Sequence, residues 1–241
     1  MKYYLVGLKN IGLLVFFCVF LMGSQCPPDN NTTTTPASKT LLITPSIQQT
    51  SSWCWATSAQ MVLRFYNYLS VNPVSPQCGI VAVWFGGQCA VDCTSCQSGI
   101  GAMSNEQYVI NNYGPFLFQS GYSQSYSVIR STLVPYALSM NDIVNEISQN
   151  RPVIIGIAPE GGWALPNVSQ HIAVLVGYDI SNGKSDVVVN DPYPFNLDTS
   201  RPNPYLFAGA TSPQLGQYVL PRLTLVQNMA WANTIYQIQS Y

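Results

Sequence analysis

A cysteine placed just before a helical pattern constrains this chain more than any other feature. Cys54 lies in the stretch Gln48–Ala56, between two tryptophans, and apolar residues then recur at 59, 62, 63 and 66, the period of a helix. A thiol at a helix N-terminus feels unpaired N–H groups, which favour the thiolate. The pattern therefore predicts a helix over about residues 55–69 that carries a reactive thiol. A small cysteine buried between two core tryptophans is the alternative.

The only histidine of the chain opens a second informative segment. His171 begins an apolar, β-branched run, and another such run, Val187–Asn190, precedes Asp191. Both runs predict strands. A cysteine nucleophile needs a base that holds the thiolate in an ion pair and a polar group that orients the base. Cys54, His171 and Asp191 supply these groups in chain order, although a lone histidine on a strand is more commonly structural.

The rest of the sequence predicts helices first and strands afterwards. An N-cap at Ser104 and the apolar periods predict helices, and alternating or β-branched runs predict strands. The helices are expected at 105–113 and 140–147, and the strands at 153–157, 217–219, 223–226 and 234–238. Helices first and antiparallel strands afterwards predict an α+β fold of two layers. The cleft between the layers would bring the helix-borne thiol to the strand-borne imidazole.

Composition narrows the classes of partner. Only 8% of the residues are charged, the net charge is −1, and the nine Lys and Arg residues form no cluster. Such a chain cannot neutralise a run of phosphates, so we expect no nucleic acid partner. No cofactor or metal is expected either. The length and the 47% hydrophobic content suit one globular domain, which we expect to be a monomer.

The N-terminus has the features of a targeting segment. A basic start precedes the apolar run Ile11–Met22, and Cys26 follows, ahead of a stretch rich in Pro, Asn and Thr. This resembles a bacterial lipoprotein signal, with Cys26 as the lipidated residue, although Gln25 stands where such signals carry a small residue. Ordinary signal cleavage and a retained anchor are the alternatives. We therefore expect a signal segment at 1–26, a polar tether at 27–41 and a folded domain at 42–241. The protein would be exported, either tethered to a membrane at the cell surface or in the periplasm, or secreted.

Four further cysteines are clustered. Cys78, Cys89, Cys93 and Cys96 lie within nineteen positions, inside a Gly/Ser-rich excursion at 78–101. In an oxidising compartment an even, clustered set predicts two disulfides, and the sequence leaves all three pairings open. A zinc site is the alternative, but the spacing lacks the paired C-x2-C of structural zinc sites.

These motifs together resemble a known family. Gln-x5-Cys-Trp-Ala, a His that opens an apolar strand, and an Asp after a second strand are similar to the papain-like cysteine peptidases. The compact bacterial branch, with staphopains, effector peptidases and bacteriocin-processing peptidases, is the closer match. The resemblance implies a two-layer fold in which a central helix bears the cysteine and an antiparallel sheet or half-barrel bears the histidine and aspartate. It implies Cys54 as nucleophile, His171 as base and then acid, Asp191 as orienting group, and Gln48 as oxyanion donor with the Cys54 backbone N–H.

Two departures from papain affect these expectations. Neighbours on a strand point to opposite faces, so only one of Asn190 and Asp191 can face His171, and the bacterial branch favours Asp191. The stretch before Gln48 is too short for a papain-type prodomain, so the enzyme would be made nearly mature or be restrained by a separate protein inhibitor. The resemblance implies an endopeptidase that acts on protein or peptide substrates. The alternatives are a non-catalytic surface binding domain and a cell-wall or isopeptide amidase.

Overall fold

A single antiparallel sheet organises the second half of the chain. The computed structural model describes residues 35–241 except 87, 126 and 160–169. Within these residues the sheet has the strand order β2-β8-β3-β4-β5-β7-β6, and β1 pairs with β4 beside this path. The strands are β1 Ser38–Thr40, β2 Ile129–Val134, β3 Val153–Ile157, β4 His171–Asp179, β5 Asp186–Asn190, β6 Thr211–Gln214, β7 Gln217–Pro221 and β8 Asn233–Ser240.

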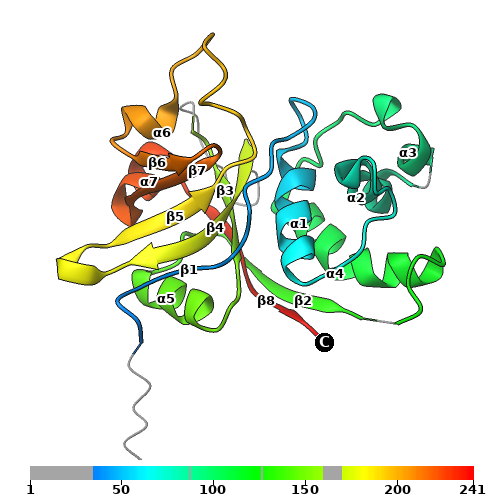
Figure 1. Cartoon of the computed structure of the whole chain (residues 1–241), viewed down its shortest axis with the longest axis horizontal. Coiled ribbons are helices and arrows are strands. Elements are labelled where there is room, and N and C mark those ends of the chain that lie inside the picture. The colour runs from blue at the N-terminus through cyan, green and yellow to red at the C-terminus, as the bar shows by residue number, and fades with distance from the viewer. Residues whose placement is uncertain (1–34, 87, 126, 160–169) are drawn as a thin grey trace, which may run out of the picture. The chain divides into compact units, whose positions relative to one another are not determined.

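Four helices from the first half of the chain lie beside this sheet. Figure 1 shows α1, α2, α3 and α4 together on one side of the strands, with α1 facing the sheet. The α+β fold class predicted from the sequence is confirmed. The helices are α1 Cys54–Phe65, α2 Pro76–Phe85, α3 Gln88–Val91, α4 Met103–Gln119, α5 Met140–Ser148, α6 Pro204–Phe207 and α7 Arg222–Asn228, with 3-10 turns at Cys93–Ser95 and Ser181–Gly183.

Helix α1 is buried on all sides and not along one face. Every residue from Trp55 to Leu63 is buried, because α1 packs on β4 as well as on α2 and α4. The Ser58 hydroxyl donates a hydrogen bond of 3.1 Å to the Ile172 carbonyl, which ties the helix to β4. The helix ends at Phe65, four residues before the predicted end, where Asn67 adopts a left-handed conformation (φ 61°). The helix that carries Cys54 is thus a rigid central element.

Strand β4 is the central strand of the site. Its residues from His171 to Tyr178 are buried, since α1 packs on this strand from the first half and α5 from the second. Strand β1 crosses so closely that a side chain at Gly177 would lie 2.8 Å from the Lys39 carbonyl oxygen. Residues 38–40, which we expected in the polar tether, are therefore a paired strand of the sheet.

Three local expectations are corrected. Residues Leu223–Val226, expected as a strand, lie in α7, where Leu225 is buried and Leu223 exposed. A run of four apolar residues is too short to distinguish the helical from the strand period. Helix α4 begins at Met103 with Ala102 at the N-cap, so Ser104 lies inside the first turn and is not the cap. The segment 78–101, expected as a Gly/Ser-rich excursion, begins within a helix, because residues 78–85 belong to α2.

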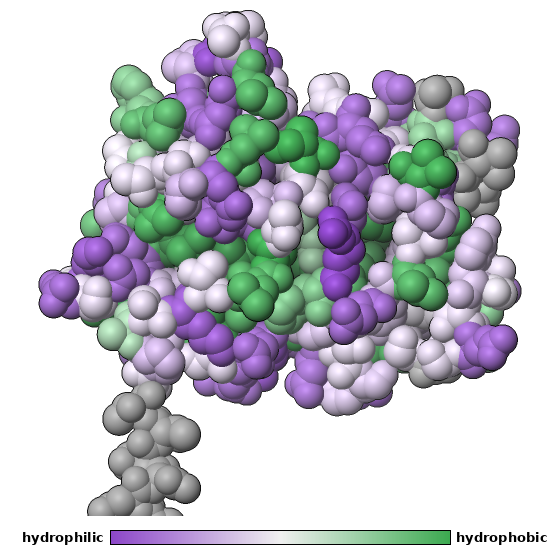
Figure 2. Space-filling view, viewed as in Figure 1, coloured by the Kyte–Doolittle hydropathy of each residue, from purple (hydrophilic) through white to green (hydrophobic). Residues whose placement is uncertain are grey.

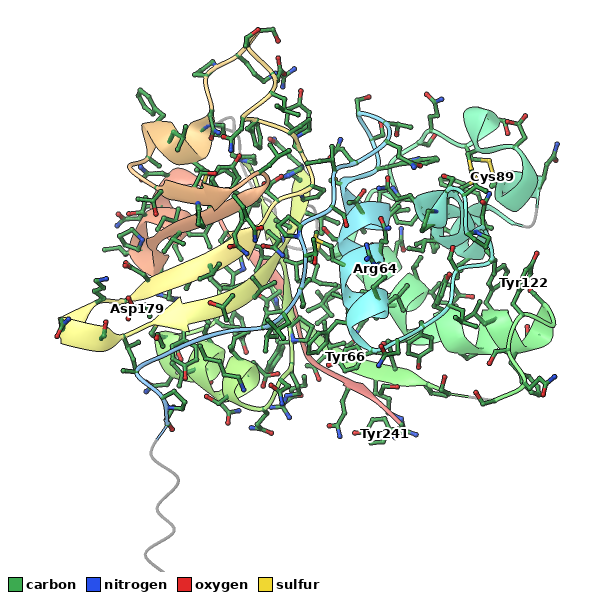
Figure 3. All side chains as sticks on the ribbon, in the orientation of Figure 1. Arg64, Tyr66, Cys89, Tyr122, Asp179 and Tyr241 are labelled. Carbon is green, nitrogen blue, oxygen red and sulfur yellow. A yellow bond between two sulfur atoms is a disulfide. The ribbon has the colours of Figure 1, made fainter. Side chains whose placement is uncertain are left out.

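The clustered cysteines form two interlaced disulfides. Cys78 pairs with Cys93 and Cys89 with Cys96, with Cα–Cα distances of 5.5 and 5.9 Å. A yellow disulfide bond is visible beside Cys89 in Figure 3. The Trp53 indole N–H donates to the Cys96 carbonyl at 3.1 Å. The disulfide segment is thereby attached to the residue that precedes Cys54.

Polar and apolar side chains alternate over the surface. Figure 2 shows hydrophobic residues in several separate places on the face drawn, among hydrophilic ones. The most exposed large hydrophobic residues are Leu42, Val74 and Phe207. Scattered exposure of this kind is usual for globular proteins. Among the described residues, no helix combines the length and the apolar character needed to cross a membrane.

Candidate active site

The thiol of Cys54 stands at the first position of α1. It is partly exposed, and it is the one free cysteine among the residues that the structure describes. Trp53 and Trp55 on either side are 2% and 1% exposed, so the backbone that presents the thiol is clamped by two core side chains. The first residues of a helix have no intrahelical acceptor for their N–H groups. Cys54 therefore combines an accessible sulfur with unpaired donors.

His171 and Asp191 are brought together by antiparallel pairing. His171 begins β4, and Asp191 directly follows the last residue of the neighbouring strand β5. Because antiparallel neighbours place the start of one strand beside the end of the next, the two side chains meet at one end of the sheet. His171 Nε2 lies 2.7 Å from Asp191 Oδ1, and Asp191 is fully buried.

The imidazole of His171 interacts with the thiol as well as with the carboxylate. Nε2 of His171 is engaged by Asp191, and the imidazole also makes a side-chain hydrogen bond with Cys54. The structure therefore brings three of the predicted residues into one row, Cys54, His171 and Asp191. This row has the connectivity of a nucleophile, a base and an orienting carboxylate.

Strand alternation separates Asn190 from Asp191. The Asn190 amide donates to the Ile43 carbonyl at 2.8 Å, and its oxygen accepts from Gln217 Nε2 at 2.8 Å. Both contacts lie away from the imidazole, while the Asp191 carboxylate faces His171. Of these two neighbours, Asp191 is therefore the one whose side chain contacts the imidazole.

Burial and the neighbouring groups change the pKa of His171 in opposite directions. Burial of the ring lowers the pKa of His171, but the Asp191 charge and the hydrogen bonds to Asp191 and Cys54 outweigh it and raise the pKa well above its ordinary value. The imidazolium is therefore favoured across neutral pH. The contribution of this pair to stability is fully present below a pH of about 6.5 and is lost as the pH rises through the raised value.

Gln48 lies near this row but outside the lining of the cleft. Its backbone N–H donates to the Pro192 carbonyl at 2.9 Å, beside Asp191. Its side-chain nitrogen donates to the Thr50 carbonyl at 2.8 Å, and its side-chain oxygen is buried without a partner among the described residues. One of the two amide hydrogens is thus engaged. The neighbouring Gln49 accepts a hydrogen bond from Ser75 and has no contact with the row.

Pockets lie beside the row formed by Cys54, His171 and Asp191. On one side, a pocket of about 240 Å³ lies between Cys54, His171 and the wall formed by residues 99–103. On the other, a pocket of about 160 Å³ is lined by His171, Tyr193, Phe195 and Arg201. A larger cavity of about 790 Å³ also includes Arg201 but neither Cys54 nor His171. His171 therefore lines both of the smaller pockets, and Cys54 lines the first.

Glu106 is a buried carboxyl group near the thiol that the sequence did not single out. It lies in the first turn of α4, is fully buried, and neither of its oxygens has a hydrogen-bond partner among the described residues. Burial and then the Cys54 charge raise the pKa of Glu106 well above its ordinary value. We expect this carboxyl group to be neutral at neutral pH, because its charged form has neither water nor a partner.

Replacing Glu106 with glutamine is expected to stabilise the protein by an amount that grows with pH. The folded chain keeps a proton on Glu106 that the unfolded chain releases above a pH of about 4.3. The free energy of unfolding of the wild type therefore falls by up to about 1.4 kcal/mol for each pH unit above that value. Glutamine removes this dependence. Urea unfolding of wild type and Glu106→Gln at pH 5 and pH 7.5 measures the difference.

Glu146 provides a matched control, because it is equally buried but fully partnered. Its carboxylate accepts from Arg151 at 2.7 and 2.8 Å and from the Gln237 backbone N–H at 2.9 Å. Glu146→Gln is expected to destabilise the protein at both pH values. If Glu106→Gln differed from the wild type by the same amount at pH 5 and pH 7.5, the assignment of a neutral Glu106 would be wrong.

Tyr205 is the second group that the sequence did not reveal. Its hydroxyl donates a hydrogen bond of 2.7 Å to Asp191 Oδ2. The pair Asn203-Pro204 is a helix-start signal and could have predicted a short helix there. No pattern in the sequence links that helix to Asp191.

Other predicted residues are outside the site or outside the described residues. The lipidation candidate Cys26 and the signal segment 1–26 lie outside the described residues. Within the described ranges, no group of three or more His, Cys, Asp or Glu side chains is arranged to hold a metal ion.

Comparison with known proteins assigns the family. A family model described as the Peptidase_C39 like family matches residues 41–208, which include all four predicted catalytic positions. No curated protein matches the chain. Among solved structures, a double glycine motif protease from an AMS/PCAT transporter, in complex with the leader peptide, is 16% identical over 83% of this chain and 94% of that chain, with a TM-score of 0.42. Digestive procathepsin L 3 of Tenebrio molitor larval midgut is 16% identical over 84% and 70%, with a TM-score of 0.49.

Proposed function

Because the chain belongs to the Peptidase_C39 like family of cysteine peptidases, we propose that it hydrolyses peptide bonds by acyl transfer to Cys54. The observation that carries this proposal is the row of hydrogen bonds from Cys54 through His171 to Asp191. The pockets beside Cys54 and His171 also support the proposal, because they leave room for a substrate. Substrates are proteins or peptides, and no cofactor takes part.

The reaction begins from an ion pair of thiolate and imidazolium. The sulfur of Cys54 attacks the carbonyl carbon of the scissile bond, a C–S bond forms, and the carbonyl electrons move to oxygen. When this intermediate collapses, the C–N bond breaks and the imidazolium of His171 gives its proton to the leaving amine. Neutral His171 then takes a proton from water, whose oxygen attacks the thioester. Release of the acid product breaks the C–S bond and regenerates the thiolate.

Gln48 and the Cys54 backbone N–H would stabilise the oxyanion. The backbone N–H at the start of α1 has no intrahelical acceptor, which supports its role. The amide nitrogen of Gln48 uses one hydrogen for the Thr50 carbonyl, so its second hydrogen is the one that the oxyanion would accept.

From the position of His171 we infer which end of the cleft would hold the acyl part of the substrate and which the leaving part. Because His171 protonates the leaving amine, the leaving part of the substrate lies on the side of Tyr193 and Arg201. The acyl part then lies along the wall at residues 99–103, on the side of Cys54. Cys96, which precedes this wall in the sequence, forms a disulfide with Cys89. Its carbonyl accepts a hydrogen bond from Trp53, the residue before Cys54.

Export is part of the proposal. Two disulfides among the described residues are typical of oxidising compartments, which supports an exported protein. We also propose that Cys26 carries a lipid anchor and that a separate protein inhibitor restrains the enzyme. The intact mass of the mature protein distinguishes a lipidated Cys26 from a plain cleaved N-terminus.

Labelling with an epoxide-type inhibitor of papain-like peptidases tests the proposed function. We expect one label per molecule, mapped by peptide mass spectrometry to Cys54, together with loss of peptide hydrolysis. The other cysteines of the described region are in disulfides and are not expected to react. Hydrolysis that persists after complete labelling of Cys54 would contradict the proposal. An unreactive Cys54 without hydrolysis would favour a binding domain.

A further inference from the structure

The second oxygen of the Asp191 carboxylate is held by a phenol that comes from a separate helix. Tyr205 Oη donates to Oδ2 at 2.7 Å, while Oδ1 accepts from the Tyr193 backbone N–H and faces His171 Nε2, each at 2.7 Å. Asp191 and Tyr205 are both fully buried. Both oxygens of the carboxylate are therefore occupied by donors.

Tyr205 can act only as a donor in this position. Burial and then the Asp191 charge raise the pKa of Tyr205 well above its ordinary value, so the phenol stays protonated. A hydrogen bond from O–H to a carboxylate is charge-assisted, and such bonds are shorter and stronger than neutral ones. The bond thus persists over the whole pH range in which the ion pair exists.

The phenol is itself fixed from two directions. The Asn203 side-chain oxygen accepts the Tyr205 backbone N–H at 3.0 Å, which caps α6. The Tyr205 ring stacks on Tyr218, with 4.1 Å between the ring centroids and 5° between the planes. Tyr218 lies on β7 opposite Val189 of β5, the strand that leads to Asp191. The phenol and its acceptor are therefore attached to the same pair of strands.

We propose that Tyr205 is a positioning residue that holds the Asp191 carboxylate, and through it the His171 ring, in the orientation that Cys54 requires. The inference rests on the proposed function of Cys54, His171 and Asp191. With a donor on each oxygen, the carboxylate cannot rotate about its Cβ–Cγ bond without breaking a charge-assisted bond. Without the phenol, Oδ2 is a buried oxygen that lacks a partner, and the carboxylate turns to find another donor. His171 Nε2 then loses its alignment.

Tyr205→Phe compared with Tyr218→Phe tests this role. Each change removes one hydroxyl from the same stacked pair, but only Tyr205 donates to Asp191. We expect Tyr205→Phe to lower kcat by about ten- to a hundred-fold, the range for a hydrogen bond to a charged group, with KM nearly unchanged. Tyr218→Phe is expected to stay within about three-fold of the wild type, because its hydroxyl makes neutral hydrogen bonds. Both enzymes are assayed with one peptide substrate.

The single histidine makes a second readout independent of activity. In a protein without a histidine tag, all imidazole signals in a nitrogen-15 NMR spectrum belong to His171. We expect Tyr205→Phe to shift the His171 Nε2 proton resonance and Tyr218→Phe to leave it in place. If Tyr205→Phe fails to fold, Asn203→Ala, which keeps the phenol and removes its cap, is expected to shift the resonance in the same direction by less.

The outcomes separate this inference from the proposed function. An active wild type with equal kcat and equal resonances in Tyr205→Phe and Tyr218→Phe would overturn the positioning role and leave the proposed function intact. An inactive wild type with an unreactive Cys54 would overturn the proposed function. The His171 Nε2 proton resonance would still decide whether Tyr205 positions Asp191 and His171. A rise in KM with unchanged kcat would place Tyr205 in substrate binding and also overturn the inference.

Discussion

Replacing Cys54 with alanine is expected to abolish peptide hydrolysis, with a loss of roughly 10⁴- to 10⁶-fold in kcat, because the members of a catalytic triad act as a unit. Only the oxyanion donors and substrate binding remain in this variant. The thiol is partly exposed, so its removal leaves no large cavity, and we expect the fold to persist. Kinetics with a fluorogenic peptide and a thermal unfolding curve measure both quantities.

Ser52→Ala is a control for this change, because Ser52 lines the same pocket. We expect its kcat to remain within a few-fold of the wild type. Hydrolysis at more than about one per cent of the wild-type rate in Cys54→Ala would point to another nucleophile. The same variant also tests the coupling within the row. Cys54 contributes to the raised pKa of His171, so the histidine should titrate at lower pH when the thiol is absent.

The second large effect is expected for His171→Ala in the alkylation of Cys54. At pH 6 an ordinary thiol with a pKa of about 8.5 is only about 0.3% thiolate. In the proposed mechanism the imidazolium of His171, whose pKa is raised, forms an ion pair with the sulfur. We expect iodoacetamide to react about a hundred-fold faster at pH 6 with wild type than with His171→Ala. The rates should converge above pH 9, where an unassisted thiol ionises.

Rates of carboxamidomethylation followed by mass spectrometry between pH 5 and pH 10 check this expectation. Since the four other cysteines of the described region form disulfides, one modified site is expected in both proteins under non-reducing conditions. Equal rates in the two proteins over the whole range would show that no ion pair forms. That result would leave Cys54 as an unreactive cysteine and would favour the non-catalytic binding domain.

Much of the fold could be predicted because its elements are long and strongly patterned. The cysteine helix, the strand at 153–157 and the strand that begins at His171 appear where the periods indicate. Prediction failed where the local signal was short. Residues Leu223–Val226 have the composition of a strand, but burial of Leu225 against the sheet makes them part of a helix.

The site could be predicted only in part, for a similar reason. Cys54, His171 and Asp191 are recognisable because a nucleophile, a base and an orienting group must each have a particular residue type. Gln48 also has the right type and spacing, but the hydrogen bond from its side-chain nitrogen to the Thr50 carbonyl has no signal in the sequence. Glu106 has no motif at all, since its properties arise from being buried without a partner.

By itself, the sequence determined the order of the elements and the chemical types available for a reaction, because helical and strand periods and reactive side chains are local properties. It also limited the partner of His171 to one of two neighbours, since strand residues alternate between faces. Only the tertiary structure decided which cysteines pair, which neighbour faces the imidazole, and that Tyr205 reaches Asp191 from α6. These contacts join residues far apart in the chain, and their distances depend on how β4, β5 and α6 pack, which no local pattern encodes.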